Sequence, residues 1–264
     1  MRSTAIFFAL VSLPLAATAC GGSSKPKAPS ASSGAAAIDV VKSAAKKTAL
    51  SGGEHATVDV GGTTSGQQLA VTGAGDFDNK EHVGSLHVDL SVAGISTSID
   101  AVLSGSDMYL RSALFSAFLP AGKSWLKLDL KQAGAAQGLN LNSLLPQDPT
   151  QSLAALQSLK AATKVGAEQI GGVSTTHYRA RIDRSKLPAA AAGNPASPGT
   201  YDTWIGGDGY VHRVRTHIAT GSGTTKSVVT LTVDLSDFGK TVKVTVPPAG
   251  QTVASSGSLP GLGG

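Results

Sequence analysis

Alternation of apolar and polar residues runs along most of the chain and predicts β-strands. In 86–92 the even-numbered positions are apolar, and in 95–103 the odd-numbered positions are mostly apolar. Alternating or shorter runs predict the other strands, in 55–60, 68–77, 108–111, 124–130, 165–170, 175–184, 201–205, 210–219, 229–235 and 242–246. Glycine-rich turns at 171–172 and 206–209 predict hairpins. The pattern is typical of antiparallel strands with one buried face.

Two segments have helical spacing instead. The first is 38–50, with Ile38, Val41, Ala45 and Thr48 on one stripe. The second begins at Asp148, which can cap a helix that has Pro149 in its first position. Leu153, Leu156 and Leu159 follow on one stripe, after a leucine-rich segment that includes Leu141, Leu144 and Leu145. We therefore expect an α+β fold in which about ten or eleven strands form one antiparallel sheet that the helices cover.

The first nineteen residues have the layout of a signal peptide. Arg2 supplies a positive charge, and the apolar run from Ala5 to Ala19 is shorter than the ~20 residues that span a bilayer. Residues 15–20 resemble a bacterial lipobox, with Ala17 where leucine is usual. We expect cleavage before Cys20, diacylglycerol on its sulfur, and a lipid-anchored protein on the extracytoplasmic face of the cell membrane. Ordinary cleavage after Ala19, which would release a secreted protein with a free thiol, is the alternative.

Low-complexity segments bound the part expected to fold. Residues 20–37 comprise the lipidated cysteine and a Gly-, Ser- and Pro-rich spacer, and residues 251–264 form a similar tail that we expect to be disordered. The segment between them, 38–250, is long enough for one domain with its own core.

Composition and charge exclude several functions. The net charge of +5 comes from scattered residues, which argues against nucleic acid binding. Cys20 is the only cysteine, so no internal disulfide can form. None of the six histidines has a partner at metal-ligand spacing, and we expect each to be solvated or simply packed. His177, for example, falls on the polar face of its strand with Arg179 and Arg181. We expect no catalysis, cofactor or metal.

The segment 112–122 links two predicted strands yet is rich in large apolar residues, Leu114, Phe115, Phe118 and Leu119. It predicts either a short helix packed on the core or an apolar lip at the mouth of a binding cavity.

Several stretches are similar to the LppX/LprG/LprF lipoproteins of mycobacteria and their relatives, a LolA-like family. The main one is the hairpin 165–178, which reads V-G-A-E-Q-I-G-G-V-S-T-T-H-Y. Residues 107–111, 125–128 and 231–239 also resemble stretches of these proteins. The resemblance implies a strongly curved antiparallel sheet, a half-barrel, with helices packed on its concave face. In the best-known members, the cavity between helices and sheet binds acylated lipids or glycolipids.

The resemblance therefore implies that a monomer binds a lipid or acylated glycolipid in an apolar cavity, for carriage or sensing. The residues expected to line that cavity are Leu114, Phe115, Phe118, Leu119, Leu141, Leu144, Leu145, Leu153, Leu156 and Leu159. The alternative is an envelope sensor with a filled core that binds a protein partner.

Overall fold

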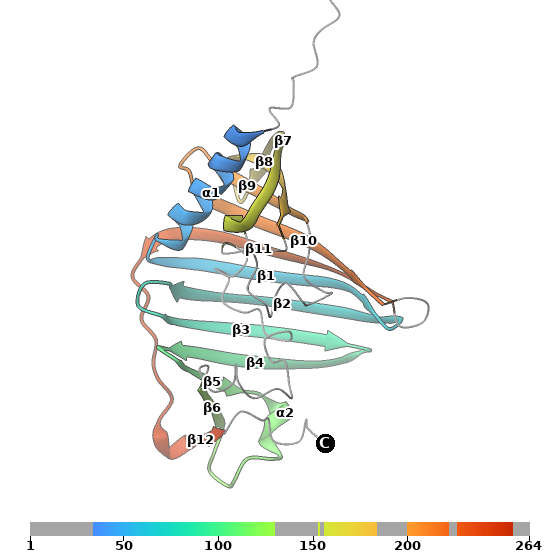
Figure 1. The fold of residues 1–264 in the computed structure, drawn as a ribbon. Coiled ribbons are helices and arrows are strands. Elements are labelled where there is room, and N and C mark those ends of the chain that lie inside the picture. The colour runs from blue at the N-terminus through green and yellow to red at the C-terminus, as the bar shows by residue number, and fades with distance from the viewer. Residues whose placement is uncertain (1–33, 130–152, 154–155, 184–199, 222–225, 256–264) are drawn as a thin grey trace, which may run out of the picture. The chain divides into compact units, whose positions relative to one another are not determined.

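The computed structural model describes residues 34–129, 153, 156–183, 200–221 and 226–255, which belong to a compact unit spanning Ala31–Gly264. Two helices, two short 3₁₀ helices and twelve strands are defined in these ranges (Figure 1). They are α1 (Ala35–Ala49), β1 (Gly53–Thr64), β2 (Gln67–Asp78), β3 (Val83–Val92), β4 (Ile95–Ser104), β5 (Asp107–Arg111), α2 (Ala113–Ser116), β6 (Trp125–Asp129), η1 (Leu156–Ser158), β7 (Leu159–Ile170), β8 (Val173–Ile182), β9 (Thr200–Gly206), β10 (Val211–Thr220), β11 (Ser227–Lys240), η4 (Ala249–Gln251) and β12 (Thr252–Ser255).

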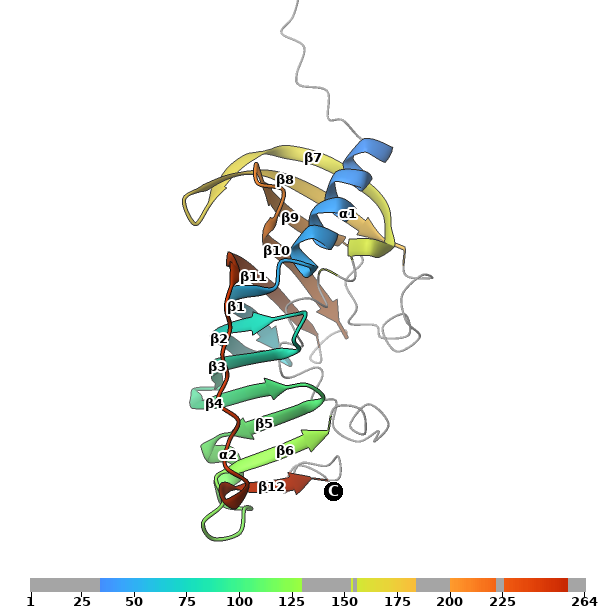
Figure 2. The same ribbon diagram turned by 90° about the vertical axis from the view of Figure 1, so that its left-hand side faces the viewer.

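The twelve strands form one sheet in the order β12-β6-β5-β4-β3-β2-β1-β11-β10-β9-β8-β7. Neighbouring strands are antiparallel except β12 and β6, which are parallel. The pairing of β1 with β11 joins the two halves of the chain into one layer, and the sheet is open and curved (Figure 2). The predicted single curved sheet with helices on its concave face is confirmed, with twelve strands in place of about ten or eleven.

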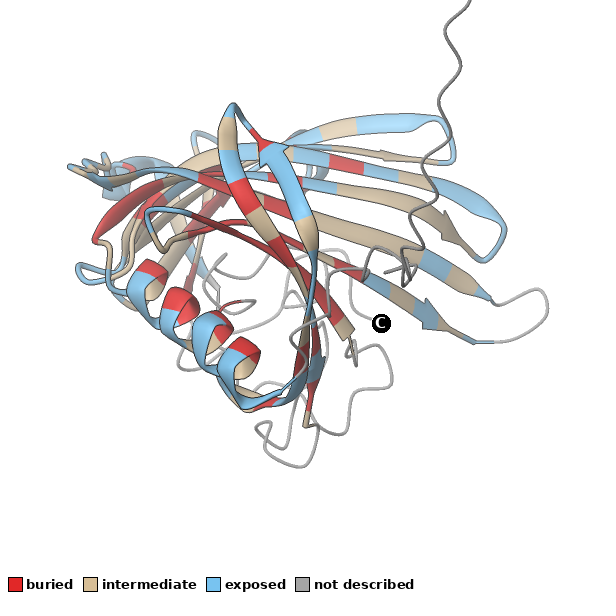
Figure 3. Cartoon of the chain, turned by 90° about the horizontal axis from the view of Figure 1, so that it is seen from above, coloured by how far each residue is buried: buried red, intermediate tan, exposed pale blue. Residues whose placement is uncertain are grey.

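Helix α1 defines the inner face of the sheet, because it packs there against β7, β8, β9 and β10 (Figure 3). Its buried residues repeat at helical spacing. Two basic residues in its last turn, Lys46 and Lys47, interact favourably with the helix dipole. Near that end, the Thr48 hydroxyl accepts a hydrogen bond from the backbone nitrogen of Val211 at 2.9 Å. The helix is therefore held to β10 by a polar contact as well as by apolar packing.

Three predicted elements differ in the structure. The helix expected through Leu156 and Leu159 is wrong, because Leu156 lies in η1 and Leu159 begins β7. The strand expected at 242–246 is wrong, since residues 241–248 form no strand and run past the ends of several strands towards β12 (Figure 1). The disorder expected from residue 251 is wrong for Thr252–Ser255, which pair with β6 as β12. The rest of that tail lies outside the described residues.

Candidate functional site: the inner face of the sheet

A continuous apolar surface crosses the inner face from β11 to β4. Strand register aligns its side chains in rows that run across the strands. One row consists of Leu231, Val60, Val71 and Leu90. The next consists of Val233, Val58, Gly73, Val88 and Ile99. The rows place apolar groups side by side on five neighbouring strands, about 19 Å across at the usual strand spacing.

Two buried clusters lie along this face. The first contains α1 and residues of β1–β3 and β7–β11, and Val41, Leu156 and Val211 are fully buried in it. The second lies beside α2 and consists of Leu110, Phe115, Leu126 and Leu128. Ala101 on β4 packs against both clusters. Five apolar residues in or beside the two rows are only partly buried, namely Val60, Leu69, Leu90, Ile99 and Leu231. We call this set the half-buried surface.

The residues expected to line a ligand cavity fall into separate groups. Leu153, Leu156 and Leu159 are 1%, 0% and 5% exposed in the first cluster, where η1 packs against α1. Phe115 and Leu119 belong to the second cluster. Leu114 and Phe118 are exposed, and Leu141, Leu144 and Leu145 lie outside the described residues. The structure thus brings the first three together and keeps them apart from the α2 group, and their role as a cavity wall stays a prediction.

The sequence predictions missed the half-buried surface as a site, although its signal was present. Val60, Leu69 and Leu90 were each placed on alternating strands with one buried face. Nothing in a single strand indicates which of its apolar residues a helix will cover. That depends on where α1 and α2 lie on the sheet, and the alternation of apolar and polar residues gives no information about their positions.

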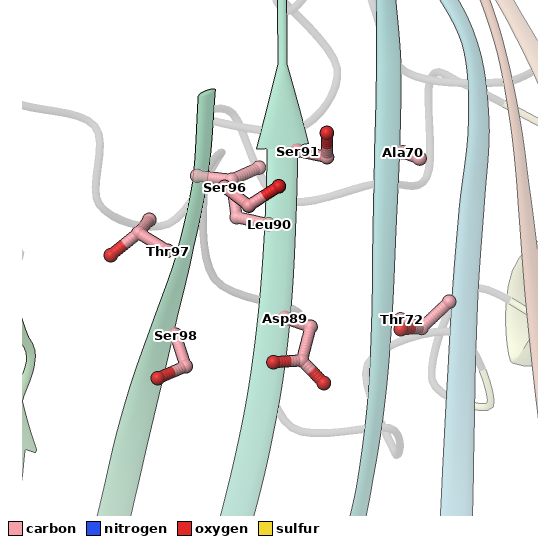
Figure 4. A pocket seen from close by; sticks show the side chains of 8 residues that line it. All are labelled: Ala70, Thr72, Asp89, Leu90, Ser91, Ser96, Thr97 and Ser98. Atoms are coloured by element: carbon pink, nitrogen blue, oxygen red, sulfur yellow. The ribbon is translucent and has the colours of Figure 1, made fainter. Parts of the chain in front are cut away.

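A shallow, open depression of about 360 Å³ lies on β2, β3 and β4 (Figure 4). Its lining is mostly polar, with one carboxylate and several hydroxyl groups. The residues are Ala70, Thr72, Asp89, Leu90, Ser91, Ser96, Thr97 and Ser98. An acyl chain that covers hydroxyl and carboxylate groups gains no favourable free energy of burial from them. This depression therefore differs from the apolar cavity expected for a lipid.

The outer face carries a compact polar network centred on His177. Its Nε2 lies 2.8 Å from Oδ1 of Asp202, and its Nδ1 lies 3.1 Å from Oε1 of Glu168. The imidazole ring stacks on Trp204 with 4.3 Å between ring centroids, and Trp204 Nε1 donates to Glu168 Oε2. Burial raises the pKa of Asp202, but hydrogen bonds from His177 and from Arg179 outweigh it and hold that pKa below its usual value.

This network joins β7, β8 and β9 through side chains, in addition to their backbone hydrogen bonds. His177 was predicted to be on the polar face with Arg179, and the structure places it there, but it is buried rather than solvated. Trp204, which covers it, is itself covered by Arg215 at 5.3 Å from the ring centroid. Among the described residues no group of His, Cys, Asp or Glu could hold a metal ion. The network links three strands on the outer face of the sheet. The apolar inner face is only partly covered by α1 and α2.

Comparison with known proteins identifies the class of this fold. The open curved sheet is the observed architecture, and the model of the LppX_LprAFG lipoprotein family matches residues 35–244. The chain belongs to this lipoprotein family, which confirms the resemblance found in the sequence.

Two solved structures are similar in fold. LprF from Mycobacterium bovis is 16% identical, with 80% of this chain and 97% of that chain covered and a TM-score of 0.49. LppX from Mycobacterium tuberculosis is 14% identical, with 80% and 98% covered and a TM-score of 0.48. No curated protein sequence matches this chain. In the described parts of the chain, no helix has the length and apolar character needed to cross a membrane.

Proposed function

We propose that this chain is a lipid-anchored extracytoplasmic lipoprotein that binds a lipid or acylated glycolipid against the half-buried surface, for carriage or sensing. Membership of a lipoprotein family supports the lipid anchor. The observation that carries the binding proposal is the half-buried surface, whose residues are neither solvated nor fully packed; Leu231, Val60 and Leu90 of this set lie in one cross-strand row.

The physical reason is the free energy of moving an acyl chain out of a membrane. Each methylene that leaves apolar surroundings for water costs about 0.8 kcal/mol, so a carrier must replace most of those contacts. A surface that crosses five strands, about 19 Å wide, offers such contacts along a row rather than at one point. Side chains that are already half-buried lose little water when a ligand covers them, while the acyl chain loses much.

The anchor follows from the same chemistry. Diacylglycerol on Cys20 supplies two acyl chains, and two chains hold a protein on a membrane stably where one does not. Residues 21–34 then separate the anchor from α1, which begins at Ala35. The domain can thus approach the bilayer from which it would load a lipid.

The test is native mass spectrometry of the protein purified from its own host, with two variants of one strand. Leu90→Gln places an amide on the inner face, and Ser91→Gln places the same group on the outer face. We expect an acyl lipid to accompany the wild type and Ser91→Gln, and to be reduced at least tenfold in Leu90→Gln. Circular dichroism checks that both variants are folded.

A mass without ligand in the wild type, together with no uptake of fluorescent acyl lipids, would contradict the proposal. Co-purification of a stoichiometric envelope protein in place of a lipid would favour the alternative function, a sensor with a filled core.

A further inference from the structure

The helical turn α2 has apolar side chains on two sides. Phe115 is 4% exposed and packs in the second cluster together with Leu119. Leu114 and Phe118, four residues apart, are 45% and 53% exposed. A short surface helix needs one apolar side to pack on a sheet, and that side is already supplied. We call Leu114 and Phe118 the apolar tip, and folding alone gives no reason for it.

The apolar tip is held in place at both ends. Before it, the Ser112 hydroxyl donates to the backbone oxygen of Ser98 at 2.6 Å and accepts from the backbone nitrogen of Leu114 at 3.3 Å. After it, the backbone nitrogen of Ser124 donates to the backbone oxygen of Gln251 at 2.9 Å, next to β12. The tip is therefore presented by a fixed base at the edge of the sheet, close to β12 (Figure 1).

The sequence segment that carries the apolar tip contains basic residues and no acidic ones. The sequence has no acidic residue between Asp107 and Asp129, and it has three basic residues there, Arg111, Lys123 and Lys127. Arg111 and Lys127 pair with carboxylates on the sheet, whereas Lys123 donates only to the backbone oxygen of Ala249 among the described residues. The Arg111 guanidinium also lies 4.8 Å from the ring centroid of Trp125. Alternation places Arg111, Trp125 and Lys127 on the face opposite Leu110, Leu126 and Leu128, so Lys123 is the one of the three basic residues that lies in the same loop as the tip. Basic residues beside apolar side chains are typical of membrane–water interfaces.

The anchor and the apolar tip can reach the same bilayer. Residues 21–34 between Cys20 and α1 span at most about 50 Å when extended. Helix α1 packs on β7–β10 and α2 on β4. Between β4 and β9 there are six strand spacings in the sheet order, about 29 Å along the sheet. The spacer is thus longer than the separation that it has to cover.

We propose that Leu114 and Phe118 insert into the interface of a bilayer that contains anionic phospholipid, as a second membrane contact beside the lipid on Cys20. Apolar burial drives the insertion, and Lys123 in the same loop attracts the anionic headgroups. The contact rests on the membrane anchor of the proposed function and is independent of whether a ligand binds. It would orient the sheet on the membrane instead of leaving the domain free to turn on its tether.

The experiment uses the full lipidated chain from its host, reconstituted into vesicles of phosphatidylglycerol and phosphatidylcholine with brominated acyl chains. Bromine quenches tryptophan fluorescence only at short range, so Phe118→Trp reports on the apolar tip. Ile95→Trp is the matched control, because Ile95 is an apolar residue that is 73% exposed at the start of β4. The native residues Trp125 and Trp204 contribute to both variants.

We expect brominated lipid to quench the added fluorescence of Phe118→Trp and to leave that of Ile95→Trp unchanged. In the double variant Leu114→Ser/Phe118→Ser, the protein should stay on the vesicles through its lipid alone.

Equal quenching of both probes, or none in either, would overturn this proposal while flotation with the vesicles would keep the anchor. Absence of flotation would remove the anchor and the contact together. A dimer in detergent that the double serine variant dissociates would assign the apolar tip to a second copy of the chain, and would also overturn the proposal.

Discussion

Replacing Asp202 by asparagine removes the charge at the centre of the outer-face network while nearly preserving the shape of the side chain. Asp202 is 8% exposed, and it accepts from His177 Nε2 at 2.8 Å and from Arg179 Nε at 2.9 Å. A hydrogen bond to a charged group contributes about 1.5–3 kcal/mol when buried. The Arg179 side chain is 58% exposed, so solvent reduces its share to under ~1 kcal/mol. We expect Asp202→Asn to lower the free energy of unfolding by about 2–3 kcal/mol near neutral pH.

The effect must depend on pH with a definite sign. The pKa of Asp202 is lower in the folded protein than the ~3.9 of an unfolded chain. Its contribution to stability is therefore complete above about pH 4 and is lost as the pH falls through the folded pKa. The wild type should lose this contribution in acid, whereas Asp202→Asn has none to lose. The difference in free energy of unfolding between the two proteins should approach zero below the folded pKa of Asp202.

Urea unfolding followed by tryptophan fluorescence measures this difference, because Trp204 contacts the network directly. Asp59→Asn is the control, since Asp59 is an exposed carboxylate on the same face of the sheet, and we expect it to change stability by less than about 0.5 kcal/mol. If Asp202→Asn is as stable as this control at neutral pH, or if its deficit persists unchanged in acid, the reasoning is refuted.

Two further predictions concern fully buried side chains. Leu156→Ala should lower the free energy of unfolding by about 2–5 kcal/mol, because Leu156 is fully buried where η1 packs on α1, and the urea midpoint measures it. Thr203→Val should raise it by about 1 kcal/mol, since the buried Thr203 hydroxyl has no hydrogen-bond partner among the described residues. A lower midpoint for Thr203→Val would show that this hydroxyl is satisfied in solution.

Alternation predicted the strands well because most of them have one buried face. It predicted a strand at 242–246 that does not form, and it missed the start of β7, where a β-bulge changes the spacing. The register of β7 against β8 shifts between Leu159 and Ala161, so the buried residues Leu159 and Ala162 are three apart in the sequence. A spacing of three is typical of a helix. The predicted helical stripe through Leu153, Leu156 and Leu159 therefore ends in a bulged strand, β7.

The candidate site was less predictable than the fold. Hydrophobicity alone predicts the leucines as cavity walls, and among the described ones Leu153 and Leu156 are the most deeply buried. Their burial places them in the first cluster, and whether they also line a cavity stays a prediction. The outer-face network around His177 was missed because Glu168, His177 and Asp202 lie on three different strands. The register between those strands brings them together, and the spacing within one strand does not predict that register.

The curvature that shapes the inner face was expected only from the family resemblance, yet the sequence contains a physical cause for it. On the concave side of a curved sheet, neighbouring side chains converge, and glycine relieves the crowding. Gly73 lies in the second apolar row opposite Val88 on β3, and Gly75 lies on the same face two residues on, opposite Leu86. A Cβ on Gly75 would collide with the backbone oxygen of Ser85, so β3 approaches β2 only because that side chain is missing. The close approach and the alignment of the apolar rows thus depend on the same glycines, which joins the shape of the sheet to the surface proposed to bind lipid.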